Sequence, residues 1–510
     1  MAAIQLTGHD LTVDDVEAAA LRGVPAELAP EAVRQIDASR ALIERVVREQ
    51  RPTYGVNTGF GKLVDVHIGA DQAAELQLNL VRSHACGVGS PFPDEVVRAA
   101  ILLRANALAK GTSGVRRELV ELLLQLLGGG VLPIVPSRGS LGASGDLAPL
   151  AHLALVLVGE GSARVGEEVL PGADALARAG LAPVELAAKE GLALINGTQF
   201  MAAIGALVLM RARRLVKLAD LAAAQTIEAV RGSRTPFSPE LQALRPHPGQ
   251  EASAANLYAL LDDSQIVASH RWCGRVQDAY SLRCSPQVHG AVRDAVAYAE
   301  RAIAIELNAA TDNPLVLADR EEVVSNGNFH GEPVAIPLDT LKIGLAELAS
   351  ISERRVERML NPTMSNGLPP FLAHESGLNS GFMITQYVAA SLVAENRVLA
   401  HPASVDSIPT SAGQEDHVSM GATAAVHLWQ VCANVERVLA VELLCGAQGL
   451  DFLAPLRPGP AVSVLHDAVR ERSPRLDRDR SLADEIDLVA AGVRDGSLLA
   501  QVEGAASELR

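Results

Sequence analysis

The sequence contains few aromatic residues, few cysteines and no cluster of positive charge. Aromatic side chains make up 3% of the 510 residues, whereas apolar side chains make up 48%. So few aromatics, in a chain rich in alanine and leucine, favour helices over a β-sandwich or a β-barrel. The apolar fraction supplies a hydrophobic core and excludes global disorder. The length allows about three average domains or one large helical assembly.

Positive charge is in the minority. The chain has 44 Lys and Arg against 60 Asp and Glu, a net charge of −16, and it contains no Lys/Arg tract. We therefore expect neither a nucleic-acid partner nor an anionic membrane surface, since both attract basic residues. The five cysteines are scattered and include no Cys-x-x-Cys pair, which argues against a disulfide framework and a structural zinc site.

Signals for export and membrane insertion are also missing. The N-terminal residues lack the basic and apolar regions of a signal peptide. The longest apolar stretch, residues 147–158, is shorter than the roughly 20 residues that span a bilayer. We expect a soluble, cytoplasmic protein.

Helical periodicity is what the chain has in abundance. Thr12 and Asp15 form a start resembling a capping box for a helix over residues 12–21, and Pro30 begins a second helix. Turn signals and short β-branched runs predict a small hairpin over residues 159–172. Further helices are predicted over residues 94–110, 113–127, 199–230, 286–310, 337–360, 382–399 and 417–446. We place a domain boundary near residue 195, between a mixed N-terminal portion (1–195) and a long-helix bundle (196–510).

Two long loops interrupt the predicted helices, and polar residues and glycines are concentrated in them. One spans residues 51–61 and the other residues 132–149. Loops held by a rigid scaffold are where functional sites tend to lie. These loops are therefore the first places to look for chemistry.

The second loop contains Ala143-Ser144-Gly145, three residues that can react with one another. Attack of the Gly145 amide nitrogen on the Ala143 carbonyl closes a five-membered ring, and loss of water there and from Ser144 leaves a methylidene-imidazolone (MIO). This electrophile needs a small residue, a serine that can dehydrate, and an unhindered glycine that can bend sharply. Taken alone, the same three residues also fit a simple turn before a helix, with Asp146 as the helix cap.

The surrounding sequence resembles the aromatic amino-acid ammonia-lyase family, and within it the members that act on histidine. The resemblance extends over nearly the whole chain. Its segments are residues 54–61 (YGVNTGFG), 83–89 (SHACGVG), 139–152 (GSLGASGDLAPLAH), 196–199 (NGTQ), 277–284 (QDAYSLRC), 311–314 (TDNP), 327–331 (GNFHG) and 401–420 (HPASVDSIPTSAGQEDHVSM).

This resemblance implies an all-α fold, a fumarase/aspartase-like long-helix bundle whose mixed N-terminal portion carries the MIO loop. It also implies a homotetramer with active sites shared between subunits, and elimination of ammonia to give a trans-α,β-unsaturated acid. The cofactor implied is the MIO formed from Ala143, Ser144 and Gly145. Neither a metal nor a nucleotide is expected, since no HExxH, P-loop or Rossmann pattern occurs in the right context.

The family's catalytic and binding residues can be carried over at matching positions. Tyr54 matches the catalytic base; because a free tyrosine has a pKa of about 10, it needs a setting that favours the phenolate, to which Lys62 would contribute. Tyr280 would lie beside the MIO, three residues from Arg283, which would pair with the substrate carboxylate. Asn196 matches the asparagine that hydrogen-bonds the MIO or that carboxylate. Further pocket positions are matched by Gln277, Asn313 and Phe329.

Substrate choice is expected to depend on His84 and Glu415. His84 matches the position that faces the substrate side chain, where phenylalanine-selective relatives usually have an apolar or aromatic residue. Glu415 matches a position where histidine-specific members have glutamate and the phenylalanine and tyrosine enzymes an uncharged amide. A carboxylate can hold an imidazole N–H, whereas a phenyl ring offers it only a desolvation cost. These residues favour histidine as substrate and trans-urocanate as product, although Gly413 replaces an asparagine common in that group.

Three alternatives remain open at this point. The chain could be a tyrosine or phenylalanine ammonia-lyase or aminomutase of the same family. It could be a non-catalytic helical scaffold, although the key residues are all present. It could also be a fumarase/aspartase-type lyase without MIO, but the GSSxMPxKxN loop of that group is absent.

Overall fold

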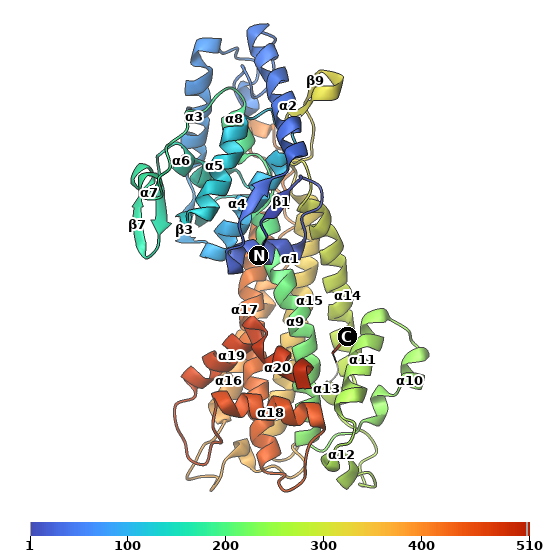
Figure 1. Cartoon of the computed structure of the whole chain (residues 1–510). Helices are drawn as coiled ribbons and strands as arrows, with labels where there is room; N and C mark the ends of the chain where they lie inside the picture. The colour runs from blue at the N-terminus through green and yellow to red at the C-terminus, as the bar shows by residue number, and fades with distance from the viewer. Residues whose placement is uncertain (1, 506–507) are drawn as a thin grey trace. The chain divides into compact units, whose positions relative to one another are not determined.

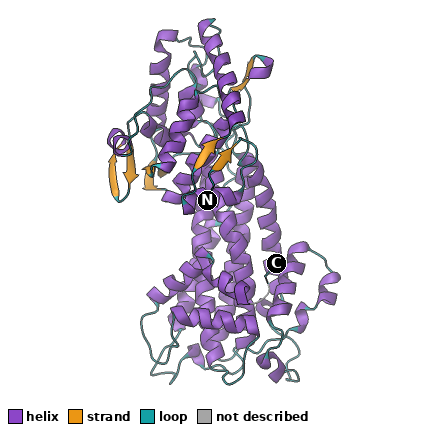
Figure 2. Ribbon diagram, viewed as in Figure 1, coloured by secondary structure: helices purple, strands orange, loops and turns teal. Residues whose placement is uncertain are grey.

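The computed structural model describes residues 2–505 and 508–510, without the side chains of Lys62 and Ala70. Helices dominate this part of the chain and the strands are short (Figures 1 and 2). The chain divides into two compact units, each assembled from segments distant in sequence. The first unit comprises Met1–Met210, Glu300–Asp339 and Pro402–Val426, and the second comprises Arg211–Ala299, Thr340–His401 and His427–Arg510. The predicted all-α class is confirmed.

The first unit contains eight helices of its own and, within the described residues, all the strands. Its helices are α1 (Val13–Arg22), α2 (Pro30–Arg48), α3 (Ala73–His84), α4 (Asp94–Ala109), α5 (Arg117–Gly128), α6 (Leu147–Leu157), α7 (Gly172–Arg178) and α8 (Glu190–Ile195). Its strands are β1 (Ile4–Leu6), β2 (Ala26–Leu28), β3 (Val88–Pro91), β4 (Val131–Pro133), β5 (Pro136–Arg138), β6 (Ser162–Val165), β7 (Glu168–Pro171), β8 (Leu315–Leu317) and β9 (Glu322–Val324).

The strands form small separate sheets instead of one large sheet. β1 pairs with β2 in parallel, while β3–β5 and β8–β9 are antiparallel pairs. β4, β6 and β7 make a three-stranded antiparallel sheet, in which β6 and β7 are the hairpin predicted over residues 159–172. These sheets connect helices and do not form a core of their own.

Local sequence signals explain the first helices. The Thr12 side chain accepts a hydrogen bond from the Asp15 N–H at 3.1 Å, and the Asp15 carboxylate accepts one from the Thr12 N–H at 3.0 Å, so the capping box is confirmed. α2 begins at Pro30 as predicted, because the first helical N–H needs no partner. Helix α5 begins at Arg117, later than the predicted Ser113.

A hydrophobic cluster beneath α2 holds the loop that carries Tyr54. Val56, in that loop, is 0% exposed and packs with the inner face of α2. The buried members of the cluster are Leu42, Ile43, Val46, Val56, Ala73, Ala188 and Val316. The loop is therefore supported from below by the core.

The second unit consists of helices and loops, with no strand among its described residues. Its own helices are α10 (Pro239–Ala243), α11 (Pro248–Leu260), α12 (Gln265–Ser269), α13 (Tyr280–Arg283), α16 (Met383–Leu399), α18 (Pro460–Arg472), α19 (Ala483–Asp495) and α20 (Ser497–Ala505). Four long helices have residues in both units: α9 (Gln199–Ala229), α14 (Ser285–Glu306), α15 (Glu332–Leu360) and α17 (Gly421–Asp451). Residues 1–195, the predicted N-terminal domain, lie within the first unit, whereas residues 196–510 are divided between the two.

The long helices match the predicted ones except at their termini: α17 ends at Asp451 and not at 446, and α14 ends at Glu306 and not at 310. α15 begins at Glu332 and contains Pro337, which sequence reasoning placed at its first turn. Val334 and Ala335 are fully buried, so packing holds the turn before the proline. α17 begins at Gly421 instead of His417, because residues up to 420 belong to the loop that carries Glu415.

Candidate active site

The loop that carries Tyr54 is folded by its own polar groups. The Asn57 Oδ1 accepts a hydrogen bond from the Thr53 N–H at 2.7 Å, and the Asn57 Nδ2 donates to the Arg51 carbonyl oxygen at 2.9 Å. Because these bonds satisfy the backbone of the turn, glycine and asparagine are favoured there over helix formers. The turn leaves the Tyr54 side chain half-buried beside a cavity.

The Ala143-Ser144-Gly145 turn is held against the segment that follows α8. Gly145 and Gly197 form an isolated parallel bridge, and the Asp146 N–H donates to the Gly197 carbonyl oxygen at 2.6 Å. Gly145 has φ of +74°, and a Cβ atom there would lie 2.1 Å from the Gly197 carbonyl oxygen. Both the backbone conformation and the space available therefore require glycine at position 145.

Replacing Gly145 by alanine should destabilise the chain and prevent ring closure. The positive φ costs about 1 kcal/mol and the forced displacement of Gly197 roughly 1–3 kcal/mol more. Gly180→Ala is the matched control, because Gly180 has φ of +72° but open space around the added Cβ. Urea unfolding of both variants measures the difference. Equal losses of unfolding free energy would contradict the close approach of Gly145 to Gly197.

Ser144 is held by a buried asparagine. Its Oγ donates a hydrogen bond to Asn196 Oδ1 at 3.0 Å. Asn196 is 1% exposed, and its Nδ2 donates to the Asn313 carbonyl oxygen at 3.1 Å and to Asp312 Oδ1 at 3.3 Å. The hydroxyl of the reactive serine therefore has a defined acceptor.

Two adjoining cavities meet at Ser144, with volumes of about 520 Å³ and 470 Å³. Both are lined by Tyr54, Gly61, Ser144 and Glu415. His84 lines the larger one, and Ala143, Asn313 and Phe329 line the other. Residues far apart in sequence are thus gathered around the Ala-Ser-Gly turn within the first unit.

Glu415 is fixed by its own loop. The Thr410 hydroxyl donates to Glu415 Oε2 at 2.6 Å, and the two backbones exchange hydrogen bonds at 2.8 and 3.2 Å. Gly413, where related sequences often have asparagine, has φ of +84° and open space around a Cβ. Asparagine tolerates positive φ better than most residues, so either residue suits the conformation of this turn.

The surroundings of Tyr54 in this chain favour the neutral phenol. Its hydroxyl oxygen accepts a hydrogen bond from the Gly61 N–H at 3.5 Å. Burial raises the pKa of Tyr54; the Gly61 hydrogen bond lowers it, and the carboxylates of Glu415 and Asp312 raise it further. This is the opposite of the setting that a phenolate base requires. The Lys62 side chain, expected to contribute positive charge, lies outside the described part of the chain.

Gln277, Tyr280 and Arg283 belong to the second unit, and in the described structure they line neither cavity at Ser144. Tyr280 and Arg283 are the ends of the short helix α13, and the guanidinium lies 4.8 Å from the tyrosine ring centroid. Arg283 Nε donates to the Asp278 carbonyl oxygen at 2.9 Å. Tyr280 is 72% exposed. The predicted shared face of Tyr280 and Arg283 is therefore present.

Asp146 does not cap α6 with its side chain, contrary to one interpretation of the sequence. Its Oδ1 accepts from the Ser140 hydroxyl at 3.1 Å and its Oδ2 from the Met201 N–H at 2.9 Å. The side chain is fully buried, and this burial outweighs the hydrogen bonds and raises the pKa of Asp146 to about 7.

Asp146→Asn should therefore become more stable than the parent chain as pH rises. An unfolded aspartate ionises near pH 3.9, so between about pH 4 and 7 the folded parent keeps a proton that the unfolded chain has lost. The parent's unfolding free energy then falls by roughly 1.4 kcal/mol per pH unit, a loss that the amide avoids. Urea unfolding at pH 5.5 and 7.5 measures the gap, with Asp37→Asn on the exposed side of α2 as control. A gap of equal size at both pH values would count against a buried, protonated Asp146.

Sequence reasoning did not select several residues around this site. Asp312 and His330 lie inside quoted motifs, where they could have been noticed, and His330 lines one of the cavities. Lys189 and Arg104 lie outside those motifs. The signal for Arg104 was a charged residue within the apolar stretch 99–109 of α4. The signal for Lys189 was a Lys-Glu pair, with Glu190, directly before the apolar run 191–195.

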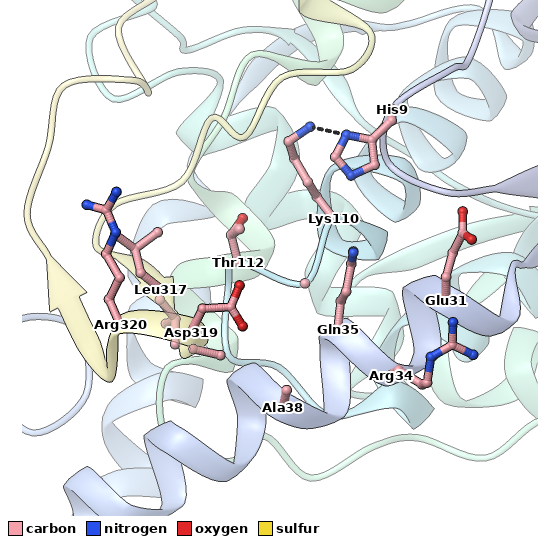
Figure 3. Close-up of a pocket in the computed structure, with 13 residues that line it drawn as sticks. His9, Glu31, Arg34, Gln35, Ala38, Lys110, Thr112, Leu317, Asp319 and Arg320 are labelled. Atoms are coloured by element: carbon pink, nitrogen blue, oxygen red, sulfur yellow. Dashed lines mark hydrogen bonds between the residues drawn. The ribbon is translucent and has the colours of Figure 1, made fainter.

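A separate cavity of the first unit lies between α2, the turn after α4 and β8 (Figure 3), with a volume of about 500 Å³. Lys110 Nζ lies 3.0 Å from His9 Nδ1 and also donates to the Gly8 and Asn308 carbonyl oxygens at 3.1 and 3.0 Å. The ammonium hydrogens are therefore already engaged. Charged side chains of both signs also line this cavity, namely Glu31, Arg34, Asp319 and Arg320. This mixture favours no single class of ligand.

Within residues 2–505 and 508–510, no helix combines the length and apolar character needed to cross a bilayer. The same residues contain no group of three or more His, Cys, Asp or Glu side chains arranged to hold a metal ion.

Comparison with known proteins adds independent findings. A family model described as "Aromatic amino acid lyase" matches residues 11–471. A histidine ammonia-lyase of Gloeobacter violaceus is 58% identical over 504 residues, which cover 99% of this chain and 98% of that protein.

Solved structures agree with the fold. The crystal structure of histidine ammonia-lyase from Trypanosoma cruzi is 45% identical, with a TM-score of 0.92, and the match covers 99% of this chain and 96% of the other. Tyrosine aminomutase from Streptomyces globisporus is 40% identical with a TM-score of 0.95, and the match covers 100% of both chains.

Proposed function

Because the chain belongs to the aromatic amino acid lyase family, we propose that it removes ammonia from L-histidine to give trans-urocanate, the first step of histidine degradation. The similar proteins of Gloeobacter violaceus and Trypanosoma cruzi are named for this activity. The observation that carries the proposal is the gathering of Ser144, Tyr54 and Glu415 around the same two cavities. We further propose that it acts in the cytoplasm.

The residues of the Ala-Ser-Gly turn fit the formation of an MIO. Gly145 has a positive φ and no room for a Cβ atom, so only glycine fits at this position. The Ser144 hydroxyl has one defined acceptor, in Asn196. When formed, the MIO supplies an electrophilic alkene that converts the substrate amine into a better leaving group. Ala143, Ser144 and Gly145 would constitute it, and Asn196 would hold it.

The remaining residues bind the substrate and move its protons. Tyr54 would take the β-proton on its phenolic oxygen. Since the pKa of Tyr54 is raised within this chain, the rate should increase with pH until the phenol ionises. Glu415 would accept a hydrogen bond from the substrate imidazole, which His84, Asn313 and Phe329 would enclose.

Gln277, Tyr280 and Arg283 complete the proposal from the second unit. Arg283 would bind the substrate α-carboxylate, because a planar guanidinium suits bidentate pairing with a carboxylate. Tyr280 would lie next to the reacting group and Gln277 at the edge of the pocket. We propose that these residues reach the Ser144 of another chain in a homotetramer.

The assay that tests the substrate is ultraviolet absorbance after addition of histidine, tyrosine or phenylalanine, since each elimination product is conjugated and has its own spectrum. Histidine should give urocanate and free ammonia. Tyrosine turnover without histidine turnover would overturn the proposal. It would favour the alternative that the chain acts on tyrosine, as the name of the Streptomyces globisporus tyrosine aminomutase indicates for that protein. Absence of turnover with all three would favour a non-catalytic scaffold.

A further inference from the structure

Two buried cations and one buried carboxylate surround Asn196. Lys189 Nζ lies 2.6 Å from Asp312 Oδ2, and the two side chains are 0% and 1% exposed. Arg104, 0% exposed, donates from Nη1 to the Asn196 carbonyl oxygen at 2.8 Å and to Gln199 Oε1 at 2.9 Å. Buried ions are costly to desolvate, and a buried ion pair is weak evidence for stability alone. Their position beside the Ala-Ser-Gly turn indicates another role.

Asp312 determines which end of the Asn196 amide faces Ser144. The Asn196 Nδ2 donates both its hydrogens, to Asp312 Oδ1 at 3.3 Å and to the Asn313 carbonyl oxygen at 3.1 Å. Turning the amide over would place its oxygen against that carboxylate and that carbonyl, leaving buried acceptors facing each other. The Asn196 Oδ1 is therefore directed to Ser144, whose Oγ donates to it at 3.0 Å.

Lys189 in turn holds Asp312 in place. Its Nζ engages Oδ2, while Oδ1 accepts hydrogen bonds from Asn196 Nδ2 and from the Asn313 N–H at 2.7 Å. Both carboxylate oxygens are thus occupied, and the carboxylate has no freedom to rotate. The order of contacts runs from Lys189 through Asp312 and Asn196 to the reactive serine.

We propose that Asp312, held by Lys189, is a positioning residue for formation of the MIO. It orients Asn196 so that the Ser144 hydroxyl is kept in one place while the turn closes. This inference rests on the proposed function, which needs the MIO.

The step balances without any oxidant or co-reactant. A bond forms between the Gly145 nitrogen and the Ala143 carbonyl carbon, and the carbonyl oxygen leaves as water with the amide protons of Ser144 and Gly145. A second water takes the Ser144 hydroxyl and its Cα proton, leaving the alkene. The chain loses about 36 Da in total.

The test follows this mass loss over time. The full-length chain and its variants are made by cell-free synthesis, and intact mass is measured at intervals on folded protein separated by size. Asp312→Leu removes the carboxylate that accepts hydrogen bonds from Asn196 Nδ2 and Lys189 Nζ. In this variant Lys189 can become neutral, because burial already lowers its pKa. We expect the mass loss of this variant to be at least about tenfold slower, as a small misplacement near a reacting group produces. Asp312→Asn, which keeps one acceptor, should be intermediate.

Arg355→Met is the control, since Arg355 forms an equally buried pair with Glu442 in the second unit. It should cost stability but leave the rate of mass loss unchanged. Mass loss at the parent rate in folded Asp312→Leu would overturn the inference while leaving the proposed function intact. If Asp312→Leu does not fold, parent-rate loss in Asp312→Asn overturns it equally. A parent chain of full mass would remove both the inference and the proposed function.

Discussion

Ser144→Ala should give a folded chain that lacks the full mass deficit of about 36 Da and has almost no activity. Without the Ser144 hydroxyl no alkene can form, so at least one of the two waters stays in the chain and the deficit of about 36 Da is not reached. Loss of the electrophile should lower turnover of histidine by about 10³-fold or more. The fold should survive, because in the described structure the Ser144 side chain makes one hydrogen bond, to Asn196.

Intact mass, circular dichroism and the urocanate assay measure the three consequences separately. Ser162→Ala, on strand β6 and exposed, is the control and should keep both the deficit and the activity. Near-parental turnover by Ser144→Ala would show that the MIO is not the electrophile. A chain that fails to fold would instead indicate that this serine is structural.

Glu415→Gln should weaken histidine turnover by about 3 kcal/mol, roughly 10²-fold in kcat/KM, as expected for loss of a charged hydrogen-bond partner in a partly buried site. The amide keeps the size of the side chain and can still accept the Thr410 hydrogen bond, so the loop should retain its conformation. Asp406→Asn, exposed in the segment before this loop, is the control and should leave kcat/KM unchanged.

The same variant should also change the pH profile. Glu415 is one of the carboxylates that raise the pKa of Tyr54, so its neutralisation should lower that pKa. A base must be deprotonated to act, and the rising limb of kcat/KM should therefore move to lower pH. An unchanged kcat/KM would exclude the substrate role of Glu415, whereas an unmoved limb would separate Glu415 from Tyr54.

Local signals were sufficient for much of the fold. The capping box at Thr12, the proline at the start of α2 and the hairpin over residues 159–172 depend on neighbours within a few residues, and each was predicted correctly. Element starts were predicted less well. Helix α15 extends beyond Pro337 towards the N-terminus, because burial of Val334 and Ala335 outweighs the local preference.

Residue chemistry and the family resemblance together determined the candidate reaction. A small residue, a serine and a glycine in that order can close and dehydrate to an MIO, and at the position that the resemblance assigns to substrate choice, the carboxylate of Glu415 favours an imidazole over a phenyl ring. These conclusions need no coordinates, because they depend on which groups exist and not on their distances. The structure adds that a Cβ at position 145 has no room beside Gly197.

The tertiary structure alone decided how those groups are supported. Asp312 is 123 residues from Lys189 and 116 residues from Asn196 in sequence, yet it contacts both of them behind Ser144, and no spacing rule predicts such a meeting. The direction of the Tyr54 pKa shift was likewise set by burial and by Glu415 and Asp312, which lie near it only in the folded chain. Desolvation and Coulomb interactions depend on burial and on distances in three dimensions, so the direction of a pKa shift can be determined only from the folded structure.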